Sequence, residues 1–151
     1  MMLWRTIQYS TAGMLAAAGL AAPQAFAGEG NSQCDFAIEV SALRAGSPTV
    51  TVGGTKDVTA KARIAKGTAP VGTVLDTMLT VDASDGGVVI DSQTIGPIRI
   101  GVGKSSKGVT VTLAIPRCNS GFIDFIATFS GTDGDGDPCE GTRRIIKECN
   151  R

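Results

Sequence analysis

Apolar and polar residues alternate with a period of two in segment after segment of this chain. In residues 122–130, for example, we expect Ile123, Phe125, Ala127 and Phe129 to point to one side. Side chains of a strand alternate between its two faces, so this pattern predicts strands that are covered on one face only. The alternating or apolar segments are residues 36–42, 58–64, 74–81, 88–90, 98–102, 109–115, 122–130 and 142–148.

Turn residues separate these segments at short intervals. The paired glycines Gly53 and Gly54 precede one segment, residues 85–87 read Asp-Gly-Gly, and Pro116 ends another segment. No segment after residue 28 combines helical periodicity with a cap and sufficient length. The sequence therefore predicts an all-β fold of seven or eight short antiparallel strands, arranged as a β-sandwich.

The first residues have the organisation of a cleavable signal peptide. Arg5 supplies a positive charge near the start, and an apolar run follows over residues 12–22. Residues 25–27 read Ala-Phe-Ala, in which the two alanines are the small residues that signal peptidase requires. The run is shorter than the ~20 residues that span a bilayer. We predict a signal peptide over residues 1–27 and one exported domain over residues 28–151, periplasmic or extracellular, with no membrane insertion after cleavage.

Composition argues against several functions. The chain has 14 basic and 14 acidic residues, and the predicted signal peptide removes only Arg5, so no excess of positive charge points to nucleic acid. The chain has no histidine, and its single tyrosine, Tyr9, lies in the signal peptide. General acid-base catalysis and copper or haem ligation therefore have few candidate residues, and we predict a non-enzymatic protein without an organic cofactor.

Two stretches resemble the immunoglobulin-like and fibronectin-type-III-like modules of bacterial exported proteins. They are residues 47–69, with paired glycines before Val-Thr-Ala-Lys-Ala-Arg-Ile, and the final hairpin over residues 122–146. The resemblance implies an immunoglobulin-like β-sandwich. It also implies a partner protein at the cell surface or in the periplasm, and a structural, adhesive or binding role at edge strands or end loops.

The four cysteines predict two disulfides, since their number is even and the compartment is oxidising. If residues 122–130 and 142–148 form the last hairpin, Cys118 and Cys149 both lie at its open end. Cys139 lies at the opposite end, where the first strand begins after Cys34. We predict the pairs Cys34 with Cys139 and Cys118 with Cys149. A Cys118 to Cys139 bridge would have to span a strand of roughly 30 Å.

The densest polar cluster is Thr-Asp-Gly-Asp-Gly-Asp-Pro over residues 132–138. Alternating carboxylates on a glycine-rich loop suit Ca²⁺, so Asp133, Asp135 and Asp137 are candidate calcium ligands. The EF-hand pattern fails, because Pro138 stands where glycine is required and Arg144 where the bidentate glutamate belongs. The alternative, which we favour, is a solvated hairpin loop in which Asp and Gly supply turn geometry.

Two further motifs have simpler interpretations. Gly103-Lys104-Ser105 ends like a phosphate-binding loop, but Ile98 occupies the position of the required glycine, so we predict a turn. Asp124 is a carboxylate within an apolar strand, and we expect it on the outward face. A hydrolase that uses a pair of carboxylates is the remaining enzymatic alternative.

Overall fold

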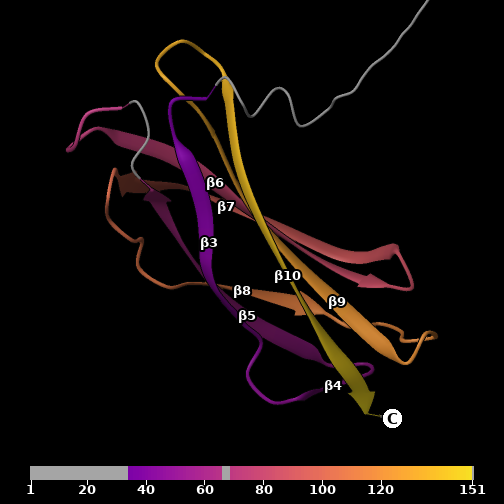
Figure 1. The fold of residues 1–151 in the computed structure, drawn as a ribbon. Helices are drawn as coiled ribbons and strands as arrows, with labels where there is room; N and C mark the ends of the chain where they lie inside the picture. Colours follow the sequence, from indigo (N-terminus) through magenta and orange to yellow (C-terminus); the bar gives the residue numbers. More distant parts are fainter. Residues whose placement is uncertain (1–33, 66–68, 151) are drawn as a thin grey trace, which may run out of the picture. The chain divides into compact units, whose positions relative to one another are not determined.

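A computed structural model describes residues 34–65 and 69–150. The predicted signal peptide, residues 1–27, lies outside the described residues. The described residues form eight strands and no helix (Figure 1). The strands are β3 (Ala37–Arg44), β4 (Thr49–Thr51), β5 (Thr55–Ala65), β6 (Val74–Asp85), β7 (Val88–Gly101), β8 (Val109–Ala114), β9 (Phe122–Thr132) and β10 (Pro138–Asn150).

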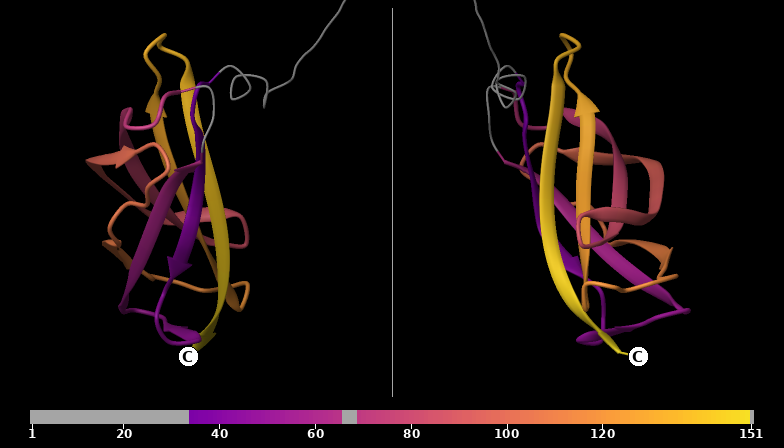
Figure 2. Two further views of the ribbon diagram at one scale, coloured as in Figure 1. Left: turned by 60° about the vertical axis from the view of Figure 1, so that its left-hand side comes forward. Right: turned by 90° about the vertical axis from the view of Figure 1, so that its right-hand side faces the viewer.

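The strands form two sheets, which lie as two layers in Figure 2. One sheet has five strands in the order β4-β10-β9-β6-β7, and the other has three in the order β3-β5-β8. Neighbouring strands are antiparallel except β4, which pairs in parallel with the end of β10. The predicted all-β sandwich of seven or eight strands with two disulfides is confirmed, and the parallel β4–β10 pair is the one departure from the predicted antiparallel pairing among the described strands.

The core consists of the side chains that alternation directs between the layers. Ile123, Phe125, Ala127 and Phe129 of β9 are all fully buried, as predicted. The buried residues of β5 in the same core are small or branched: Val58, Ala60, Ala62 and Ile64. Burial of this apolar surface is the main driving force for the fold.

Three local features differ from the pattern read from the sequence. A bulge between Val40 and Ala42 of β3 shifts the register, so Leu43 is buried in place of Ala42. Alternation predicts separate strands over residues 88–90 and 98–102, but Val88–Gly101 is one continuous strand that pairs with β6 along its length. The predicted turn before residue 55 contains the short strand β4.

The two disulfides are Cys34–Cys139 and Cys118–Cys149, as predicted, with Cα atoms 5.4 and 6.5 Å apart. The first joins the start of β3 to the start of β10. The second joins the loop before β9 to the end of β10. Disulfides of this kind are typical of proteins in oxidising compartments.

One side of the sandwich closes where β3 passes over β10. Gly141 lies so close to the backbone carbonyl of Ile38 that a Cβ atom would collide with it. Two positions further along β10, the Arg143 guanidinium donates hydrogen bonds of 3.3 and 3.1 Å to the carbonyls of Val40 and Ser41 at the bulge. The backbone of β10 at Gly141 and the side chain of Arg143 therefore cover this edge of β3.

On the other side of the sandwich, β7 and β8 are neighbours. The Asp91 carboxylate of β7 accepts the backbone amide of Ala114 at 2.7 Å. β7 is an edge strand, and a charged side chain on an edge strand opposes hydrogen-bonded pairing of that strand with a strand of another chain. No helix in the described part of the chain is long and apolar enough to cross a membrane.

Candidate functional site

The predicted calcium loop lies at the tip of the β9–β10 hairpin, which extends at one end of the sandwich in both views of Figure 2. Antiparallel pairing of the two long strands places the tip beside the start of β3. Gly136 adopts a positive φ of 85°, which a glycine accommodates without strain. The loop is therefore a tight, internally bonded turn.

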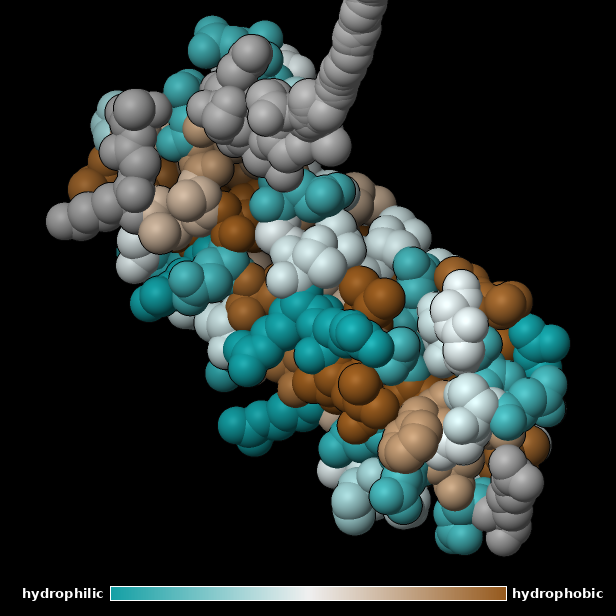
Figure 3. Space-filling model, turned by 45° about the vertical axis from the view of Figure 1, so that its right-hand side comes forward, coloured by the Kyte–Doolittle hydropathy of each residue, from teal (hydrophilic) through white to brown (hydrophobic). Residues whose placement is uncertain are grey.

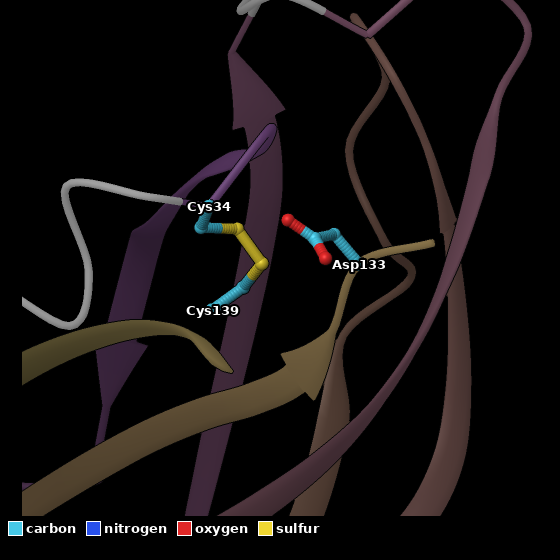
Figure 4. Close-up of side chains that lie close together, drawn as sticks. All are labelled: Cys34, Asp133 and Cys139. Atoms are coloured by element: carbon cyan, nitrogen blue, oxygen red, sulfur yellow. A yellow bond between two sulfur atoms is a disulfide. The ribbon is translucent and has the colours of Figure 1, made fainter. Parts of the chain in front are cut away.

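Asp133 is the centre of this loop. One carboxylate oxygen, Oδ1, accepts the backbone amides of Asp135 and Asp137, both at 2.9 Å. The other, Oδ2, accepts the backbone amide of Asp35 at 3.1 Å. The side chain lies next to the Cys34–Cys139 disulfide (Figure 4) and is buried, with 7% of its surface exposed. The Asp133 carboxylate therefore stabilises both the hairpin turn and the segment that leads into β3.

The electrostatics of the loop follow from these bonds. Burial by itself raises the pKa of Asp133, but amides of Asp35, Asp137, Asp135 and Gly136 outweigh it and hold the pKa below its ordinary value. The pKa of Asp137 is raised, by burial first and then by the negative charges of Asp133, Asp135 and Asp35. The tip therefore carries a concentrated negative potential.

The carboxylates that converge are not the three that the sequence suggested. Oxygens of Asp35, Asp133 and Asp135 lie within 4.8 Å of one another, and Asp137 is not in this group. Asp35 was missed because it is 98 positions from Asp133. Its position next to Cys34, together with the predicted Cys34–Cys139 bridge, was the signal that could have placed it here. The sulfurs of Cys34 and Cys139 are bonded to each other.

A second buried carboxylate, Asp85, was not singled out from the sequence. It accepts the amides of Asn119 and Ser120 at 2.8 and 2.9 Å and the Ser120 hydroxyl at 2.7 Å, with the Arg117 guanidinium at 3.6 Å. These bonds, led by the Asn119 amide, lower its pKa to about 2. Asp85 thus holds the end of β6 to the loop that contains Cys118.

The outer face of the five-stranded sheet carries an apolar ridge formed by Phe122 and Ile146, whose residues are 49% and 52% exposed. The two residues come from neighbouring strands, because Phe122 pairs with Glu148 and Ile146 with Asp124. Hydrophobic side chains lie open among hydrophilic ones in the space-filling view of Figure 3. The ridge was not predicted from the sequence, because alternation predicts polar residues on the solvent-facing side of a strand and both ridge residues are apolar.

Both ridge residues line two hollows of the surface. One, of about 290 Å³, is bounded by Gly86, Ser120, Phe122, Asp124, Arg144 and Ile146. The other, of about 450 Å³, is bounded by Pro48, Thr49, Phe122, Ile146 and Glu148. Asp124 is on the outer face, as expected, where it forms an ion pair of 2.9 Å with Arg144. The ridge therefore has a polar border, as the rims of protein interfaces do.

No protein-family model matches this chain, and no curated protein sequence matches it. Among solved structures, it is similar to Spo0M, a sporulation control protein from Bacillus subtilis, with a TM-score of 0.50 and 12% identity over 76% of this chain. The chain spans 50% of the Spo0M chain. It is also similar, with a TM-score of 0.41 and 15% identity, to the CARDB domain of the PF1109 protein from Pyrococcus furiosus in complex with di-metal ions. That match covers 77% of this chain and 88% of the CARDB chain. At its level of identity, the likeness to Spo0M concerns the fold.

Proposed function

We propose that this chain is a non-enzymatic, exported β-sandwich module that binds another protein through the Phe122–Ile146 ridge. The observation that carries the proposal is the exposure of two large apolar side chains side by side on the outer face of the sheet. Exposed apolar groups that cluster and have a polar border are typical of protein interaction sites.

The ridge is held in place before any partner arrives. Phe122 follows the loop that contains Cys118, which a disulfide and the bonds of Asp85 fix in position. Ile146 precedes Cys149, the other half of that disulfide, by three residues. A preorganised surface loses little conformational freedom on binding, so more of the contact energy contributes to affinity. The expected partner offers aliphatic or aromatic side chains to the two hollows.

Two properties of the chain support a non-enzymatic, exported module. Two disulfides suit an oxidising compartment, in agreement with the predicted signal peptide. The buried carboxylates Asp85 and Asp133 accept three hydrogen bonds each from nearby groups and stabilise loops. Such bonds stabilise the ionised form and weaken a carboxylate as a base.

Site-specific photo-crosslinking tests the proposal. A photoreactive phenylalanine analogue replaces Phe122, and the same analogue replaces Ala114, an exposed residue of the other sheet, as the control. We expect one adduct with an exported protein from position 122 only. The purified partner should bind the wild-type chain and lose affinity for Phe122→Ala. Equal labelling from both positions, or binding that Phe122→Ala leaves unchanged, would contradict the proposal.

Calcium binding at the hairpin tip is the second candidate function. It is favoured by the convergence of Asp35, from the start of the described chain, on Asp133 and Asp135. Three carboxylates are a suitable beginning for a Ca²⁺ site. Thermal melting with and without excess Ca²⁺ tests it: a binding site raises the melting temperature of the wild type but not of Asp135→Asn. An equal melting temperature in both conditions would exclude the site.

A further inference from the structure

The outer face of the three-stranded sheet carries a second surface feature, on the opposite side of the core from the ridge. Arg44 of β3 and Lys61 of β5 line a small hollow of about 150 Å³ together with Ala42 and Thr59. The antiparallel register of β3 and β5 brings these four residues together, since Arg44 pairs with Thr59 and Ala42 pairs with Lys61. The hollow has room for about five water molecules. We name it the Arg44–Lys61 hollow.

The two cations of this hollow are not neutralised within the described residues. The four ion pairs of the described residues use Arg63, Arg99, Arg117 and Arg144. Two acidic residues of the same sheet have other partners, since Glu39 pairs with Arg63 and Asp57 accepts a hydrogen bond from the Thr112 hydroxyl. Arg44 and Lys61 therefore give this part of the sheet face an uncompensated positive charge, which favours an anionic group.

The complementary charge lies at the hairpin tip of the same chain. Asp135, Asp137 and Glu140 are acidic residues at or next to the tip, and none of them is in an ion pair of the described residues. The tip also lies at one extremity of the sandwich in both views of Figure 2. The acidic tip is therefore complementary in charge to the sheet face around the Arg44–Lys61 hollow.

We propose that the acidic hairpin tip of one copy docks into the Arg44–Lys61 hollow of a second copy. The carboxylates of Asp135 and Asp137 would face Arg44 and Lys61. Because the two surfaces differ, the contact is heterologous and leaves one free tip and one free hollow in each pair, so chains grow head to tail. The interaction depends on exposed charges, so it is weak and sensitive to salt. It does not rest on the proposed partner of the ridge, which lies on the other sheet.

Sedimentation velocity of purified, disulfide-bonded protein tests the proposal over a concentration series. We expect the wild type to self-associate at low salt and to dissociate in about 1 M NaCl, where the Debye length falls to about 3 Å. One variant, Arg44→Glu with Lys61→Glu, reverses the hollow. A second, Asp135→Lys with Asp137→Lys, reverses the tip. Each should weaken self-association by roughly tenfold or more, because like charges then oppose each other.

Mixing the two variants gives the decisive result. The tip of the second variant is basic and the hollow of the first is acidic, so the mixture should form a complex that neither variant forms alone. Arg99→Glu with Lys147→Glu, a double charge reversal away from both surfaces, should associate like the wild type. Circular dichroism confirms that each variant is folded.

Three results would overturn the proposal: a wild type that is monomeric at all concentrations and salt conditions, variants that still self-associate, or a mixture that forms no complex. Binding of polyglutamate or heparin to the hollow without self-association would also overturn it and would assign the hollow to an external polyanion. A monomeric wild type that still gives the Phe122 adduct leaves the proposed function intact.

Discussion

The Asp133 carboxylate accepts the backbone amide of Asp35 at 3.1 Å across 98 positions of sequence. The same carboxylate closes the hairpin turn through the amides of Asp135 and Asp137. One side chain therefore joins the segment before β3 to the last hairpin, next to the disulfide that links the same two segments.

Replacing Asp133 by asparagine should lower the melting temperature by several degrees, because an amide group is a weaker acceptor than a carboxylate. Asp135→Asn is the matched control, since its side chain is exposed and the change should leave the melting temperature nearly unchanged. Hydrogen exchange at the Asp35 amide should accelerate in Asp133→Asn only. Equal exchange in both variants would show that the hydrogen bond contributes little.

Stability should fall in acid through Asp85. Folding lowers the pKa of this carboxyl from the ordinary value of 3.8 to about 2, so its contribution is fully present above about pH 4 and is lost as the pH falls toward 2. Urea unfolding between pH 5 and pH 2 measures this loss, and Asp85→Asn should show a smaller pH dependence. An unchanged pH profile in the variant would assign the acid sensitivity to other carboxylates.

The two disulfides should differ in their contributions to stability. Cys34–Cys139 closes a sequence separation of 105 residues and Cys118–Cys149 one of 31. The chain-entropy model gives about 5 kcal/mol for the longer loop and about 4 kcal/mol for the shorter. Denaturant unfolding of the two double Cys→Ala variants tests the order. A larger loss from Cys118→Ala with Cys149→Ala would show that the bridge acts mainly through native-state contacts.

Gly141→Ala should destabilise the sandwich by about 1–3 kcal/mol, since the new Cβ would collide with the Ile38 carbonyl and push β3 from β10. Gly134→Ala is the control, because a Cβ at Gly134 meets no atom within 4 Å and its φ is not positive. Denaturant midpoints of the two variants should differ clearly. Similar midpoints would mean that β3 accommodates the methyl group by a small shift.

Substitutions of two phenylalanines of β9 should have different effects on the free energy of unfolding. Phe125 is fully buried, so Phe125→Ala should cost about 3–5 kcal/mol of unfolding free energy. Phe122 is half exposed on the outer face, and Phe122→Ala should cost about 1 kcal/mol or less. A large loss of stability in Phe122→Ala would identify the ridge as part of the packing of the fold.

The buried residues of β5 and β9 could be predicted from the sequence, whereas the bulge in β3 and the contact between Asp35 and Asp133 could not. Alternation in β5 and β9 identified their buried residues correctly, because a strand has a fixed period of two. The bulge at Val40 and Ala42 broke that period, so Leu43 was missed. Asp35 could not be placed beside Asp133 by local pattern, since a carboxylate binds amides from any segment that the fold brings near it.

The all-β class, most inward-facing residues and, given the last hairpin, both disulfide pairs follow from the amino-acid sequence. These properties depend on local periodicity and on which end of a strand each cysteine occupies. The folded arrangement sets which carboxylates meet, where Gly141 lets β3 approach β10, and that Phe122 and Ile146 form a ridge beside two hollows. Those relationships join residues that are distant in sequence, and the register and packing of the two sheets set them.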